Sequence, residues 1–326
     1  MQNDSWKSWL LQRLKSRDVL IGLALMTLCV GLGLYLRIGG LPRGYSSDEM
    51  AMLQPWGFWQ ILTDPESAVN PPLLRLMFNV PFDTAHTLYY GRLFSFCCNI
   101  VAIGLAFWLG RLVSRSNLGG LVAAGLVVFH PYAGLQASIF RSYSAWMLIA
   151  FWHLISLCRL VETRGDRSVA VAIQVGVSAF LLPQIHFFSV PILLAEGLAL
   201  LTLFPANRKD FLLFVPAGLG FLPFGIYILN EPARRVLPDN EGVWGAVETV
   251  VGISGMLEQV AMVLVLCLLF WPLLNRGQRM LLCGAMGVVV SVVIFGGKQL
   301  VRPPASIFML PFFAVLTAAI PWLIPK

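Results

Sequence analysis

An adjacent pair of acidic residues, Asp48 and Glu49, is the part of the sequence best suited to chemistry. A carboxylate can remove a proton from an attacking hydroxyl group, and a second carboxylate beside it can support the first. Turn residues precede the pair and apolar residues at helical spacing follow it, so Ser46 or Ser47 is expected to cap a short helix with both acids in its first turn. A simpler explanation is that the acids only complement the helix dipole, which contributes about 0.3 to 1 kcal/mol.

Further polar residues stand near the ends of later apolar stretches. Each has a local explanation: Arg141 can extend its side chain to the membrane surface, His186 can have a local partner, and Lys298 can be an anchor. Together with the acidic pair they predict a cavity with one base and several cations, which suits a substrate that carries phosphate. The residues of this predicted substrate site are Asn70, Arg75, Arg141, Tyr143, His186, Lys298 and Arg302.

The elements that must position these residues are transmembrane helices. The stretch 19–36 carries no charged residue and is just long enough to cross a hydrocarbon core of about 30 Å as a helix. Basic residues precede it and no small-residue cleavage site follows it, so it is expected to be a retained anchor and not a signal peptide. Apolar stretches follow at 93–113, 118–137, 142–158, 168–183, 186–204, 211–229, 258–274, 280–297 and 305–324.

This pattern predicts an all-α polytopic membrane protein with about ten transmembrane helices. With 58% hydrophobic and 12% charged residues, the chain leaves little material for a separate soluble domain, so residues 1–326 are expected to form one transmembrane domain. Its expected parts are the first span (19–36), a first external loop with interfacial helices (37–92), central spans (93–229), a second external loop (230–257) and three last spans (258–324).

The distribution of charged residues predicts how the chain is oriented in the membrane. Most of the 23 Lys and Arg residues fall on the side of the N-terminus, and short cytoplasmic loops collect such residues, so both termini are expected to be cytoplasmic. Most of the 16 acidic residues fall on the opposite, external side, which also has the two long loops. The net charge of +7 is dispersed over many loops, which argues against a nucleic-acid partner and predicts contact with membrane lipid.

A metal site is weakly supported. Asp48 and Glu49 with His186 could hold a divalent ion, but these ligands alone make a weak set, so no metal or other cofactor is expected. All six cysteines fall inside predicted spans, which gives no support for a disulfide framework.

The order of the motifs resembles the GT-C superfamily of integral-membrane glycosyltransferases, in particular the branch of the protein O-mannosyltransferases and the aminoarabinose transferases of lipid A. The motifs are the acidic pair, a Pro-Pro-Leu at 71–73, an Arg-x-Tyr at 141–143, a His-Phe-Phe at 186–188 and an Arg-Pro at 302–303. Relatives usually have His-Pro-Pro in place of residues 70–72 and Arg-Pro-Tyr in place of residues 141–143.

The resemblance implies transfer of a sugar from a polyprenyl-phosphate carrier to an acceptor on the external face of a bacterial inner membrane. It implies that Asp48 is the catalytic base, that Glu49 supports it, and that Arg141 and Arg302 contact the carrier phosphate. His186 and Tyr143 match family positions. One carboxylate suffices for inversion in a single displacement, because phosphate is already a good leaving group.

Two other functions stay open. A transporter or flippase for a lipid-linked substrate should show an internal repeat and charges near the middle of the membrane, and Glu196 is a charge of this kind. A non-catalytic subunit would keep the fold and use its loops to hold partner membrane subunits or lipid.

Overall fold

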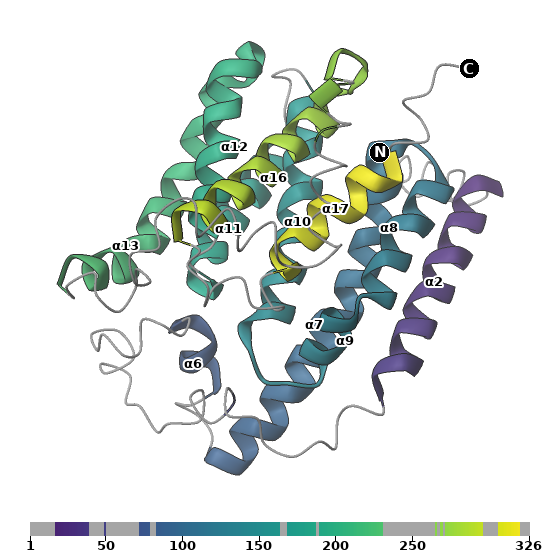
Figure 1. Ribbon diagram of the computed structural model, residues 1–326, viewed down its shortest axis with the longest axis vertical. Coiled ribbons are helices and arrows are strands. Elements are labelled where there is room, and N and C mark those ends of the chain that lie inside the picture. Colours follow the sequence, from purple (N-terminus) through teal and green to yellow (C-terminus); the bar gives the residue numbers. More distant parts are fainter. Residues whose placement is uncertain are drawn as a thin grey trace, which may run out of the picture.

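The computed structural model of the protein describes residues 17–38, 49, 72–78, 83–163, 168–186, 189–230, 265, 268–269, 271–295 and 306–319. Within these ranges the chain is helical and contains no β-strand. The prediction of an all-α protein is therefore confirmed for this part of the chain. Most of the helices lie side by side along the long axis of the molecule, with α2 (Arg17–Ile38) at one edge and α12 (Ser189–Leu203) near the opposite one (Figure 1).

Three of the described helices are long and apolar enough to cross a membrane: α2, α7 (Thr84–Ser114) and α10 (Ser142–Glu162). The pair α8 (Asn117–Phe129) and α9 (Pro131–Ala137) meets the same criterion as one span bent by 65°. These helices indicate that the protein associates with a membrane. The count of about ten spans stays a prediction.

The remaining described helices complete the bundle. Two are apolar but shorter than a full span, namely α11 (Val169–Ile185) and α12. A 3-10 helix, η1 (Pro205–Phe214), takes up the start of the predicted span 211–229. The other elements are α6 (Pro72–Phe78), α13 (Val215–Asn230), η3 (Trp271–Leu273), α16 (Arg276–Phe295) and α17 (Ser306–Ala319).

Helix α10 forms the centre of the bundle and packs against α7, α11, α16 and α17. Most of its candidate spanning window is buried, whereas α2 is mostly exposed at the periphery. Close packing of α7 on α8 depends on glycine, since a Cβ atom at Gly120 would lie 2.8 Å from the carbonyl oxygen of Phe107. Small residues let two apolar helices approach closely where hydrocarbon offers no other driving force.

The bend between α8 and α9 is produced by Pro131, which has no N–H to bond the carbonyl group four residues before it. Arg37 at the end of α2 replaces this lost bond. Its guanidinium group donates to the carbonyl oxygens of Val127 at 2.9 Å and Val128 at 3.2 Å, and to the side chain of Asn99 at 2.6 Å. The predicted span 118–137 is thus not one straight helix, and a buried arginine satisfies the backbone at its break.

Candidate functional site

The cluster of candidate residues at one end of the bundle is organised by Glu49. Its carboxylate is fully buried and accepts two hydrogen bonds from Arg92 of α7, from Nε and from Nη2, each at 2.7 Å. The backbone N–H of Phe140 donates a third bond to it at 2.8 Å. A paired, hydrogen-bonded arrangement of this kind is what a buried carboxylate needs, because an unpaired charge in the interior is costly. Glu49 therefore contacts both α7 and the connection that precedes α10.

Phe140, in the connection that precedes α10, contacts both α6 and α7. Its ring packs at 5.1 Å, edge to face, on the ring of Phe78 at the end of α6. The ring also lies directly against Gly91 of α7, where a Cβ atom would fall within 2.4 Å of it. The glycine before Arg92 thus leaves the space in which Phe140 packs, and the same packing brings the N–H of Phe140 to Glu49.

Arg141 begins the next helix, as the sequence predicted. It is the N-cap residue of α10, with extended backbone, and its side chain makes no capping hydrogen bond. In the first turn of the helix, the ring of Tyr143 lies 5.6 Å from the ring of His186. The structure therefore brings Arg141, Tyr143 and His186 to the same end of the bundle as Glu49.

His186 differs from its predicted place at the start of a span. It forms the C-terminal cap of α11, where its N–H donates to the carbonyl oxygen of Leu182 at 2.9 Å, and it lies in the connection to α12. Burial first, and then the positive charge of Arg141, lowers the pKa of His186 to about 3. The imidazole is therefore neutral at physiological pH, and the adjacent cationic charge belongs to Arg141.

Arg75 also lies at this end. It is on α6, which packs against α7 and α11, and its side chain is 1% exposed. The carbonyl oxygen of Phe78 at the end of α6 accepts a hydrogen bond of 3.1 Å from the hydroxyl group of Thr87. We call Glu49, Arg75, Arg92, Arg141, Tyr143 and His186 the Glu49 cluster. Three arginines and one glutamate give it net positive charge, which favours an anionic ligand.

Four predicted site residues lie outside the described residues: Asp48, Asn70, Lys298 and Arg302. The roles of Asp48 as base, of Arg302 as a phosphate contact, and of Asn70 and Lys298 in substrate binding stay predictions. Among the ranges that the structure describes, no group of three His, Cys, Asp or Glu side chains is placed to hold a metal ion.

Two residues of the described chain were missed by the sequence reasoning. Arg92 is not among the predicted site residues, although it binds the one acid of the Glu49 cluster. His153 lies in the middle of the predicted span 142–158, and it pairs with Glu196 in the middle of another. The signal for His153 was available, since an ionisable residue inside an apolar span needs a partner on a neighbouring span.

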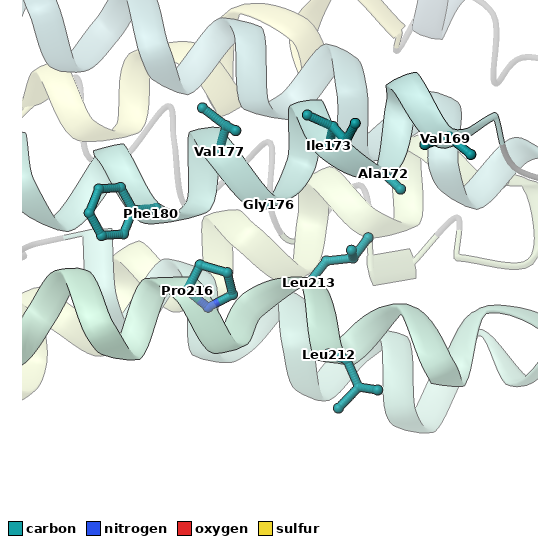
Figure 2. A pocket seen from close by; sticks show the side chains of 9 residues that line it. All are labelled: Val169, Ala172, Ile173, Gly176, Val177, Phe180, Leu212, Leu213 and Pro216. Carbon is teal, nitrogen blue, oxygen red and sulfur yellow. The ribbon is translucent and has the colours of Figure 1, made fainter.

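The described chain also has an apolar groove on its surface, with a volume of about 590 Å³. It lies between α11 and the segment formed by η1 and α13 (Figure 2). All of its lining residues are apolar or glycine, among them Ile173, Phe180 and Leu213. None belongs to the Glu49 cluster, and without a polar side chain the groove cannot supply acid or base chemistry.

No protein-family model matches the chain, and the curated proteins with which it was compared gave no match either. The family suggested by the motifs therefore stays a prediction.

Proposed function

We propose that this protein is an integral-membrane glycosyltransferase of the GT-C type, which transfers a sugar from a polyprenyl-phosphate carrier to an acceptor at the external face of the membrane. The proposal is supported by one observation above all: Glu49, Arg141, Tyr143 and His186 come from segments far apart in the sequence and meet at one end of a helical bundle. The cationic excess of the Glu49 cluster fits the phosphate of such a carrier.

In this proposal the residues of the Glu49 cluster act together with Asp48 and Arg302, and each has a separate role. Asp48 accepts the proton of the acceptor hydroxyl group as its oxygen attacks the anomeric carbon. The bond from that carbon to the phosphate oxygen breaks, and the polyprenyl phosphate leaves with the charge held by Arg141 and Arg302. Glu49 is a positioning residue, because its contacts with Arg92 and Phe140 anchor the peptide next to the proposed base. Neutral His186 and Tyr143 line the sugar side of the site.

The first test is binding, because it does not require the acceptor to be known. Protein in lipid nanodiscs is titrated with polyprenyl phosphate and, separately, with the uncharged polyprenol. We expect selective binding of the phosphate, and a loss of roughly 10- to 100-fold in affinity for Arg141→Gln, since bonds to a charged group are worth about 1.5 to 3 kcal/mol. Equal binding of phosphate and alcohol would remove the proposal.

Turnover of the sugar donor then distinguishes an active transferase from a non-catalytic subunit. Release of polyprenyl phosphate from a sugar-loaded donor is followed in the presence of membrane extract, and Asp48→Asn should lower it by about 10²- to 10⁴-fold while leaving phosphate binding intact. The matched control is Asp83→Asn. Asp83 is an exposed acid that caps α7, and Asn can keep that cap. Phosphate-selective binding without donor turnover in the wild-type protein would favour the non-catalytic subunit, and full turnover by the Asp48→Asn variant would refute the base assignment.

A further inference from the structure

Helices α10, α11 and α12 each contribute one side chain to a hydrogen-bonded chain of polar groups in the core. This chain shares no residue with the Glu49 cluster. On one side of His153 in α10, Nδ1 lies 2.8 Å from the hydroxyl oxygen of Ser178 in α11. On the other side, Nε2 lies 3.0 Å from Oε2 of Glu196 in α12. None of the three side chains is more than 1% exposed. An ionisable pair inside an apolar bundle is expensive, so it marks a functional site by default.

Hydrogen positions along this chain follow from its hydrogen-bond partners. The Ser178 hydroxyl group donates to the carbonyl oxygen of Gln174 at 2.6 Å, so its oxygen is left to accept from Nδ1–H of His153. Nε2 and the facing oxygen of Glu196 then have one hydrogen between them. When that hydrogen is on Glu196, both groups are neutral, and the pair avoids the several kcal/mol that each buried charge costs.

The second carboxyl oxygen of Glu196 has no hydrogen-bond partner among the described residues, although it is buried. It faces α16, where a Cβ atom at Gly284 would lie 2.8 Å from it. A carboxylate would leave charge on this unpartnered oxygen, whereas a carboxylic acid leaves only a carbonyl group. The geometry therefore favours the protonated acid.

No permanent cation of the described chain forms an ion pair with Glu196. The titratable groups that face it are His153 and Cys158 of α10 and Cys283 of α16. From η1, the ring of Phe214 packs edge-on at 5.9 Å against the ring of His153. The pair is thus enclosed by thiols and an aromatic ring, and its own two members are the strongest proton donor and acceptor at this place.

Two further titratable side chains of α10, Cys158 and Glu162, lie near Gly277 of α16. Cys158 donates a weak hydrogen bond of 3.8 Å from its sulfur to the carbonyl oxygen of Gly277. A Cβ atom at Gly277 would lie 3.5 Å from this sulfur and 3.5 Å from Oε1 of Glu162. Glu162 is only half-buried near the end of α10.

We propose that His153 and Glu196 form a proton-binding site in the core of the bundle, which holds one proton between them and exchanges it with solvent. The resting site is a neutral carboxylic acid that donates from Oε2 to Nε2. Uptake of a further proton gives an imidazolium whose Nε2–H donates to Oε2, with the acid proton on Oε1; loss of the resting proton leaves a carboxylate. This site is independent of the proposed transferase chemistry, and it would serve proton movement or a protonation-dependent change in the side-chain contact between α10 and α12.

The test is infrared spectroscopy of the full-length protein in lipid. At neutral pH the wild-type protein should show the C=O stretching band of a protonated carboxylic acid, which Glu196→Gln removes. The matched control Glu162→Gln changes a half-buried acid of α10 and should leave the band unchanged. His153→Asn should keep the band but shift its frequency, because the acid loses its hydrogen-bond acceptor. Transfer to D₂O should shift the wild-type band as the acidic proton is replaced.

The outcomes are decisive even if Glu196→Gln does not fold. Absence of an acid band in the wild-type protein would mean that Glu196 is ionised, which overturns the proposal. A band that stays unshifted in D₂O would describe a static contact between helices and also overturn it. A band that is indifferent to His153→Asn would show that the proton is not shared with His153.

Discussion

Two buried glutamates, Glu49 and Glu196, show how differently one side chain can be used in this bundle. Both are fully buried. Glu49 is held by a permanently charged arginine and a backbone N–H, so its negative charge is fixed. Glu196 faces a titratable histidine and keeps one oxygen without a hydrogen bond among the described residues. The first arrangement fixes a position, and the second allows a proton to move.

The largest effect should come from removing the cation of the fixed pair. Arg92→Ala leaves the carboxylate of Glu49 buried without its charged partner, and loss of one partner of a buried ion pair costs about 3 to 5 kcal/mol. Unfolding in mixed micelles, followed by helix content, measures this. A loss below about 1 kcal/mol would mean that Glu49 does not need its cation, and the contrast with Glu196 would fail.

The same substitution, glutamate to glutamine, should lower the free energy of unfolding by different amounts at the two sites. Glu49→Gln leaves Arg92 buried without a negative partner and should cost roughly 2 to 5 kcal/mol. Glu196→Gln can still donate a hydrogen bond to Nε2 of His153, so it should cost only about 0.5 to 1.5 kcal/mol. The measurement is the free energy of unfolding of both variants under one condition. Equal losses would show that Glu196 is held as a charge, like Glu49.

A smaller effect should follow from crowding the unpartnered oxygen of Glu196. Gly284→Ala places a methyl group 2.8 Å from that oxygen and against the ring of Phe312, and overpacking of this kind costs about 1 to 3 kcal/mol. The control is Gly125→Ala in α8, where nothing lies within 4 Å of the new Cβ atom. It should stabilise the helix by up to about 1 kcal/mol. Thermal unfolding of the two variants compares them, and a neutral Gly284→Ala would mean that α16 does not confine Glu196.

Sequence reasoning placed several elements correctly but did not show that one of them is bent. The start of α10 at Arg141 and the position of Glu196 inside a helix are confirmed. The predicted span 118–137 corresponds to α8 and α9, which meet the criterion for a span together but are bent by 65° at Pro131, where Arg37 of a distant helix satisfies the freed carbonyl groups. Hydropathy alone cannot show such a break, since both halves are apolar.

The candidate site was predicted only as a set of residue types. The sequence placed Glu49, Arg141 and His186 near the ends of apolar stretches, and the structure brings them together. Sequence reasoning did not identify Arg92 as the partner of Glu49, because many cations flank the spans and nothing local distinguishes one from another. The neutral state of His186 likewise depends on burial and on Arg141, which are properties of the packed bundle.

The helical, membrane-associated character of the chain follows from its amino-acid sequence alone, because long apolar segments must satisfy their backbone hydrogen bonds internally. Which polar groups meet depends on the tertiary structure. Glu49 and Arg92 are 43 residues apart, Glu49 and Phe140 are 91 apart, and His153 and Glu196 are 43 apart. Helical periodicity tells which face a side chain occupies, but its partner depends on which helices pack together and at what rotation.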